Sequence, residues 1–81
     1  MAAQPHKWRL RASGDLGRTI ADIRRLNDWT QEELASQAGI ERTYLAKLEA
    51  GQSVLLLDRA LRALNLMGAS VVVTWDDDRE A

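Results

Sequence analysis

The chain has 81 residues and carries 11 lysines and arginines against 12 acidic residues, so its net charge is −1. A chain this short forms one domain and buries only about 60% of its unfolded surface, which favours self-association. The absence of cysteine excludes disulfides, zinc–thiolate sites and thiol nucleophiles. Because no long apolar run or signal-peptide pattern is present, we expect a cytoplasmic protein with no membrane contact.

The amino-terminal part carries most of the positive charge. Residues 1–30 hold six basic and three acidic groups, residues 31–51 hold two and four, and residues 52–81 hold three and five. The slight overall acidity counts against a nucleic-acid partner, since contacts with phosphates supply much of such binding. The uneven distribution weakens that objection.

The first elements expected along the chain are a strand and a helix. Residues 7–12 alternate between basic and apolar side chains, which predicts a short strand in an arm that covers residues 1–12. Residues 13–15 are typical of a turn and helix cap. An apolar stripe then predicts a helix from Leu16 to about Asp28.

Two short helices are expected next. Thr30 and Glu33 have the spacing of a capping box, so the first helix begins at Thr30 or Gln31. Its inward face carries Leu34, Ala35 and Ala38. Gly39 is expected to end it in the left-handed conformation. The second helix covers residues 41–50 with Leu45 and Leu48 inward, and so tight a connection makes the two helices cross steeply.

The carboxy-terminal part predicts a further helix and a strand. Residues 53–66 are helical, either as one longer helix or as two, with Leu57, Leu61 and Leu64 on one stripe and Asp58 largely exposed. The helical domain thus covers residues 13–68. Residues 69–75 contain a β-branched, alternating strand, and residues 76–81 form an acidic tail.

The pair of short helices resembles the Cro and phage-repressor type of helix-turn-helix, also called the Xre family. The family pattern TQ-x-x-LA-x-x-x-G-(I/V) is matched by Thr30, Gln31, Leu34, Ala35, Gly39 and Ile40, and a variant of L-x-x-x-E-x-G by Leu45, Glu49 and Gly51. The resemblance covers roughly residues 16–66. It implies a mainly α, lambda-repressor-like bundle of four to five helices whose third helix lies in the major groove of double-stranded DNA.

The terminal strands pose a separate problem, because an isolated hairpin is marginal in water. We expect the two strands to pair and then to form a sheet with a second copy, giving a two-fold homodimer. The dimerisation residues would be Trp8, Leu10, Val71, Val73 and Trp75. The alternative keeps both strands within one subunit.

This architecture is similar to that of HipB-like antitoxins, which are small Xre-family proteins with an added carboxy-terminal strand. The resemblance implies a homodimeric repressor on a palindromic operator and a HipA-like kinase toxin as partner. The sequence shows no site for a toxin. Two other interpretations stay open, a free-standing Xre regulator and a protein-interaction module that keeps the helix-turn-helix shape.

The family pattern also assigns the candidate DNA contacts. Those with bases are Glu41, Arg42, Thr43 and Lys47, among which Arg42 can pair with guanine through its guanidinium group. Those with phosphates are Thr30, Gln31, Tyr44, Gln52 and Ser53. Glu41 departs from the usual Ser or Thr of its position and could either accept from a cytosine amine or repel phosphates.

One further pair has a structural role in the family. Arg24 and Glu49 are expected to form a partly buried ion pair that links the first and third helices. Catalytic motifs, metal-ligand clusters and phosphate-cradling glycine loops are absent from the sequence, so we expect neither an enzyme nor a cofactor. The acidic run at residues 76–78 fits a solvated tail better than a cation site.

Overall fold

A computed structural model describes residues 6–76 of the chain. The order of elements is β1 His6–Leu10, α1 Ser13–Leu26, α2 Gln31–Ala38, α3 Arg42–Glu49, α4 Leu55–Leu66 and β2 Val71–Trp75. The fold is therefore mainly helical, with four helices and a two-stranded antiparallel sheet in the described part, which confirms the predicted fold class.

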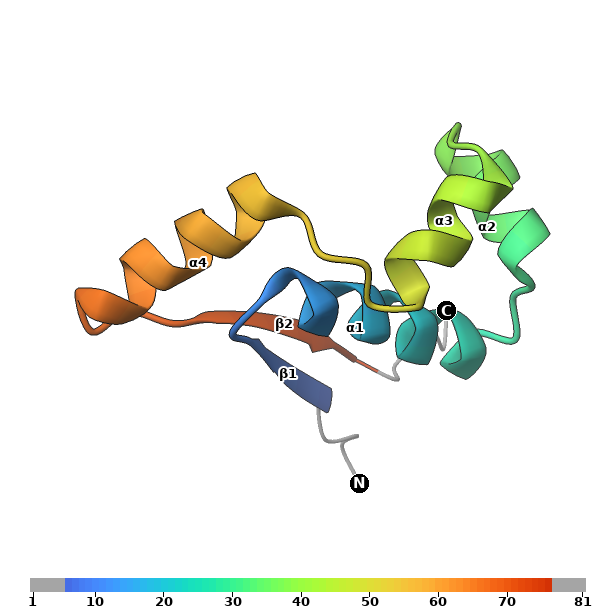
Figure 1. Cartoon of the computed structure of the whole chain (residues 1–81). Helices are drawn as coiled ribbons and strands as arrows, with labels where there is room; N and C mark the ends of the chain where they lie inside the picture. Colours follow the sequence, from blue (N-terminus) through green and yellow to red (C-terminus); the bar gives the residue numbers. More distant parts are fainter. Residues whose placement is uncertain (1–5, 77–81) are drawn as a thin grey trace, which may run out of the picture.

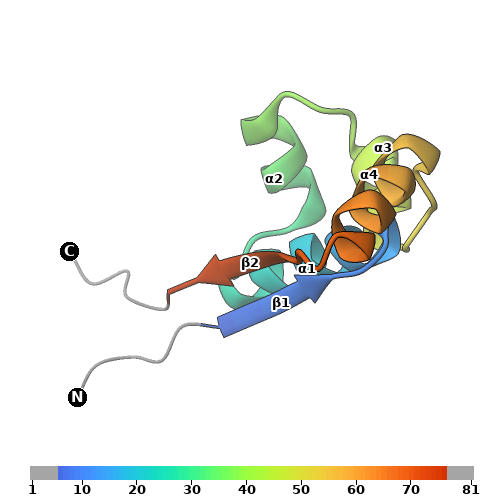
Figure 2. The ribbon, with the colours of Figure 1, turned by 90° about the vertical axis from the view of Figure 1, so that its left-hand side faces the viewer.

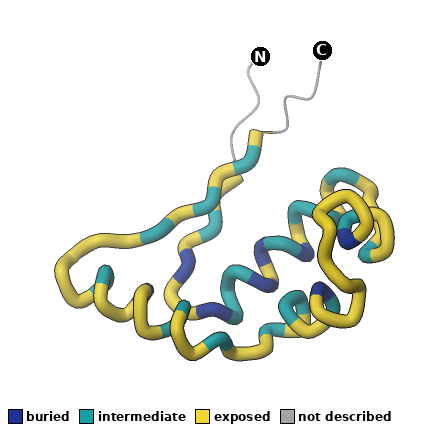
Figure 3. The backbone as a smooth tube through the Cα atoms, turned by 90° about the horizontal axis from the view of Figure 1, so that it is seen from above, coloured by how far each residue is buried: buried dark blue, intermediate teal, exposed yellow. Residues whose placement is uncertain are grey.

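Helix α1 lies at the centre of the molecule and contacts β1, α3 and α4 (Figure 1). The α2–α3 unit stands at one end, α4 extends at the other, and the two strands run beside α1 (Figure 2). The buried apolar side chains are Leu10, Ala21, Ala35, Leu45 and Leu61, which come from five different elements (Figure 3). The core is consequently small and depends on α1 to connect its parts.

The first helix begins earlier than the sequence predicts. Ala12 is its N-cap, and the Asp15 carboxylate folds back to accept the backbone amides of Arg11 at 2.7 Å and Ala12 at 3.1 Å. This cap turns the chain into the helix at Ser13, so residues 13–15 belong to the first helical turn and Arg11 and Ala12 lie outside the strand. The predicted turn at 13–15 and the strand end at residue 12 are therefore wrong.

The two terminal strands pair with each other within the subunit. Trp8 lies opposite Val73 and Leu10 opposite Val71 in the antiparallel register. The indole nitrogen of Trp8 donates to Asp22 of α1 at 3.0 Å, and Leu10 is buried. The alternation along β2 is as predicted, with Val71, Val73 and Trp75 half-buried between more exposed neighbours. Leu10 needs no second copy for its burial.

Helix α4 is a single helix fixed to the start of α1 by polar contacts. The Asp58 carboxylate accepts the Ser13 amide at 2.6 Å and the Ser53 hydroxyl at 2.6 Å. The Ser13 hydroxyl in turn accepts the Val54 amide at 2.8 Å. Asp58 is therefore half-buried rather than largely exposed, and because Ser53 is engaged ahead of the helix, α4 starts at Leu55 instead of residue 53.

Gly17 allows the closest approach between α1 and α3. A Cβ atom at this position would lie 1.6 Å from the Leu48 carbonyl oxygen and 2.6 Å from its carbon. Both obstructing atoms belong to the backbone, so no side chain can move aside to relieve the clash. Only glycine is compatible with this packing of α3.

We predict that Gly17→Ala destabilises the protein by at least about 3 kcal/mol, the upper end of overpacking costs, because α3 must move away from α1. Gly14→Ala on the same helix is the matched control, since its Cβ would meet no atom closer than the Gly51 carbonyl at 3.4 Å. Thermal unfolding followed by circular dichroism measures both. Wild-type stability in Gly17→Ala would contradict this packing.

Candidate functional site

The α2–α3 unit is built around a sharp turn at Gly39. Thr30 and Glu33 form the predicted capping box, in which the Thr30 hydroxyl accepts the Glu33 amide at 3.0 Å and the Glu33 carboxylate accepts the Thr30 amide at 2.8 Å. Gly39 ends α2 in the left-handed conformation, with φ of 72°. The Ile40 amide then donates to the Ala35 carbonyl at 3.0 Å, which closes the helix end and sets the direction of α3.

Only part of the inward face predicted for this unit is buried. Ala35 and Leu45 are buried and Leu34 and Leu48 are half-buried, whereas Ala38 is exposed. The prediction for Ala38 is wrong because α2 is short and its last turn extends beyond the packed part of α3. Leu45, with 1% of its surface exposed, fixes which side of α3 faces inward.

The exposed surface of α3 and its N-cap carries the candidate base contacts. These residues are all exposed, namely Glu41, Arg42, Thr43 and Lys47. Tyr44 beside them is 54% exposed. Neither the Arg42 nor the Lys47 side chain forms a hydrogen bond or ion pair within residues 6–76. Their charged groups are therefore free to meet an external ligand.

The amino-terminus of α2 offers a second kind of contact. The first amides of a helix have no intrahelical acceptor, so the amides of Gln31 and Glu32 are available to an anion such as a phosphate oxygen. Thr30 is exposed at this end, although its hydroxyl already accepts the Glu33 amide. Two acidic side chains, Glu32 and Glu33, lie in the same turn and oppose that attraction.

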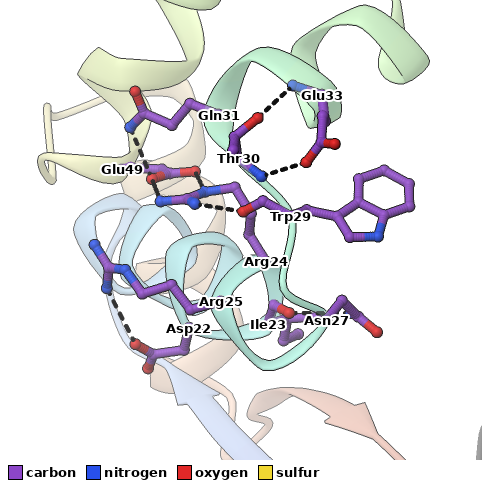
Figure 4. Close-up of polar contacts among 10 residues, drawn as sticks. All are labelled: Asp22, Ile23, Arg24, Arg25, Asn27, Trp29, Thr30, Gln31, Glu33 and Glu49. Carbon is purple, nitrogen blue, oxygen red and sulfur yellow. Dashed lines mark hydrogen bonds and ion pairs between the residues drawn. The ribbon is translucent and has the colours of Figure 1, made fainter.

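A buried ion pair holds α1 to α3 behind this surface (Figure 4). Arg24 donates through Nε to one Glu49 oxygen at 2.8 Å and through Nη2 to the other at 2.9 Å. Gln31 of α2 adds a bond to Glu49 at 2.9 Å, and Arg24 reaches the Trp29 carbonyl at 2.7 Å. Because α1, α2, α3 and the α1–α2 connection all contribute, we call these four residues the Arg24 clamp.

The clamp changes the charge of the helix-turn-helix surface. The Arg24 hydrogen bonds lower the pKa of Glu49, an effect that burial opposes and the Gln31 bond reinforces. The same bonds raise the pKa of Arg24. The Glu49 side chain is only 4% exposed. The acidic excess within residues 31–51 is therefore smaller than the sequence suggests, because Arg24 neutralises one carboxylate from outside that segment.

The candidate phosphate contacts are not equally available. Tyr44 and Gln52 have exposed side chains, whereas the Gln31 amide nitrogen is bound to Glu49 and the Ser53 hydroxyl to Asp58. The bonds that Gln31 and the Trp29 carbonyl make within the clamp were not predicted from the sequence. The position of Gln31 directly after a capping residue, near the expected Arg24–Glu49 pair, is the signal that could have revealed them.

The described part of the chain contains little that would suggest another kind of site. Within residues 6–76, no three His, Cys, Asp or Glu side chains come together in a way that could hold a metal ion. None of the described helices is long and apolar enough to cross a membrane. A shallow apolar groove of about 300 Å³ lies between α1 and α2, lined by Ile20, Ile23, Arg24, Asn27, Trp29 and Leu34.

Comparison with known proteins gives two matches. A family model described as helix-turn-helix matches residues 20–73, which is two thirds of the chain. The chain is also 27% identical over 71 residues to y4mF of Sinorhizobium fredii (strain NBRC 101917 / NGR234), named as an uncharacterized HTH-type transcriptional regulator. That alignment covers 88% of this chain and 93% of the relative. No solved structure matches the chain.

We predict that the Arg24 clamp makes the free energy of unfolding depend on pH. Since the pKa of Glu49 is lowered in the folded state, its stabilisation is complete above the unfolded pKa of about 4.3 and is lost as pH falls through the folded value. Glu49→Gln should cost about 1.5–3 kcal/mol at neutral pH, because it removes the charge from the hydrogen bonds. It should also flatten the melting-temperature profile below about pH 5, where the unfolded chain begins to bind protons.

The control is Glu32→Gln, which neutralises an exposed glutamate of α2 and should leave the profile unchanged. The pKa values of Asp15 and Asp58 are also lowered, by the Arg11 amide and the Ser53 hydroxyl respectively, so Glu49→Gln should retain part of the acid sensitivity. A profile for Glu49→Gln that runs parallel to that of the wild type would contradict this role of Glu49.

Proposed function

The chain belongs to the helix-turn-helix family of DNA-binding transcriptional regulators, and from this premise we propose that it is a homodimeric repressor that reads a palindromic operator through α3. The observation that carries the proposal is the exposed side of α3, where Arg42 and Lys47 are unpaired within residues 6–76. The Arg24 clamp supports it by holding this side rigidly outward, since reading base edges requires a fixed helix.

The assignment of contacts follows from chemistry. Arg42, in the first turn of α3, would pair with O6 and N7 of a guanine. Thr43 would offer its methyl to thymine or its hydroxyl to a base, and Lys47 would reach a second guanine or a phosphate. Tyr44 and the open amides of α2 would contact the backbone and fix the register. Glu41 would accept from a cytosine amine.

A two-fold dimer follows from the way such helices read DNA. One α3 covers only a half-site, and two copies would occupy half-sites about 34 Å apart, one helical turn of DNA. The described sheet has two strands, so each strand has one edge without a partner in it. Pairing of such an edge with a second copy, with Trp8, Leu10, Val71, Val73 and Trp75 behind it, remains our proposal for the sheet.

We further propose that the protein is the antitoxin of a HipBA-like pair and restrains a HipA-like kinase toxin while both are bound to DNA. The supporting feature is the strand β2, which follows the helical domain and pairs with β1. Co-purification with the product of the adjacent open reading frame tests this role. An adjacent product that is unrelated to kinases, or that does not bind the protein, would leave a free-standing regulator.

We predict that Arg42→Ala loses sequence preference. A duplex is first selected from a random library with the wild-type protein, and affinities for it and for a scrambled duplex are then compared at fixed salt. Loss of the guanine contact should lower the preference by about 5- to 150-fold, which corresponds to about 1–3 kcal/mol. Affinity for the scrambled duplex should fall much less.

The matched control is Arg62→Ala, which removes an exposed arginine from α4 and should leave the preference unchanged. Wild-type affinity should also fall log-linearly with salt, as phosphate contacts require. A module that uses this shape only to bind proteins would show neither salt dependence nor sequence preference, and full preference in Arg42→Ala would mean that α3 is not the reading helix.

A further inference from the structure

The apolar groove between α1 and α2 is not used by the DNA contacts proposed above. Its walls are Ile20 and Ile23 of α1 and Leu34 of α2, all of them half-buried, and its volume is about 300 Å³. Small-molecule sites in proteins begin at about this volume and are lined mainly by apolar side chains with a few polar groups. The groove therefore has the size and the lining of a site for a small ligand.

The Trp29 side chain stands at the edge of this groove. Its backbone is fixed on both sides, because its amide donates to the Arg24 carbonyl at 3.0 Å and its carbonyl accepts from Arg24 Nη1 at 2.7 Å. The indole extends away from the Arg24 clamp (Figure 4) and is 40% exposed. The backbone of this residue thus belongs to the fold, while its aromatic ring is available to a ligand.

A second hollow, which is polar, lies beside the same indole. Its volume is about 520 Å³, and its lining contains two carboxylates, Asp28 and Glu33, and no basic side chain. The Asp28 carboxylate forms no hydrogen bond or ion pair within residues 6–76, and Glu33 uses one oxygen to accept the Thr30 amide. This hollow therefore attracts positive charge. Asn27 and Trp29 line both hollows, so the two meet at these residues.

Arg24 lines the apolar groove as well, but it offers no charge to an anionic ligand. Its guanidinium group donates to both oxygens of Glu49 and to the Trp29 carbonyl. The Arg24 side chain is only 10% exposed. The charge that a ligand meets at this place is therefore set by Asp28 and Glu33.

We propose that the two hollows form one binding site for a small amphipathic cation, which we call the Trp29 site. The apolar body of the ligand lies in the groove against Ile20, Ile23 and Leu34, and its ammonium group lies beside the indole and the two carboxylates. The negative face of an indole attracts a cation, and the carboxylates add an attraction that salt screens. None of the candidate DNA contacts lines either hollow, so the site does not depend on the proposed function.

The test compares three probes, hexylamine, hexanol and hexanoate, which share one apolar chain and are cationic, neutral and anionic at neutral pH. Each is titrated into the full-length ¹⁵N-labelled protein and followed by nuclear magnetic resonance. We expect hexylamine to bind about 5-fold more tightly than hexanol, since a cation beside an exposed indole contributes up to about 1 kcal/mol. Hexanoate should bind most weakly. The Trp29 indole signal should shift most, and those of Trp8 and Trp75 should stay in place.

Two variants separate the parts of the site. Asp28→Asn removes one carboxylate but keeps the left-handed backbone at this position, where φ is 60°, because asparagine also adopts this conformation readily. It should reduce the preference for hexylamine over hexanol and leave hexanol binding unchanged. Trp29→Leu keeps an apolar side chain and removes the ring, so it should reduce the same preference. Circular dichroism confirms that both variants are folded.

The matched control is Glu32→Gln, which neutralises an exposed glutamate of α2 that lines neither hollow. It should retain the wild-type preference for hexylamine. A loss of preference in Glu32→Gln equal to that in Asp28→Asn would show that general surface charge, and not the Trp29 site, attracts the amine.

Other outcomes would also overturn the proposal. They are absence of binding by all three probes, equal affinity for hexylamine and hexanol, tighter binding of hexanoate, and shifts centred away from Trp29. Full preference in a folded Asp28→Asn protein would remove the carboxylate from the site. Because no residue of the Trp29 site is a candidate DNA contact, each of these results is independent of the Arg42→Ala test of DNA binding.

Discussion

The structure depends on one buried ion pair, between Arg24 and Glu49. A buried charge without a partner is costly, so each of these residues fixes the position of the other, and with them the positions of α1 and α3. The bonds from Gln31 and to the Trp29 carbonyl bring α2 and its connection to α1 into the same arrangement. In a larger domain, extensive apolar packing fixes the positions of the helices. Because the core here is so small, the Arg24 clamp fixes them instead.

The same pair connects the fold to the surface that we propose reads DNA. With Glu49 held inward and Leu45 buried, the side of α3 that carries Thr43 and Lys47 faces outward, and Arg42 is exposed in the first turn of the helix. Neutralisation of Glu49 by Arg24 also removes a negative charge that would repel phosphates. The glycine at position 17 completes the arrangement, because α3 could not lie this close to α1 beside any larger residue. Stability and binding surface are therefore linked through one set of contacts.

Features set by local chemistry could be predicted from the sequence. The Thr30–Glu33 capping box, the left-handed turn at Gly39 and the alternation of β2 all follow from neighbouring residues, and the structure contains them.

Features set by contacts between distant residues could not be predicted from the sequence. The early start of α1 requires the fold-back of Asp15, the burial of Asp58 requires Ser13 45 positions away, and the need for glycine at position 17 requires the Leu48 carbonyl. Within the candidate site, the exposed residues of α3 followed from the family pattern, whereas the engagement of Gln31 depended on three-dimensional proximity.

The most direct test of the central claim is a nuclear magnetic resonance titration of the uniformly ¹⁵N-labelled protein with its selected duplex. If the clamp presents α3 to the major groove, the backbone amides of residues 41–47 and of the first turn of α2 should shift most, while those of β1 and β2 change little. Largest shifts on the strands, with α3 unaffected, would contradict the account.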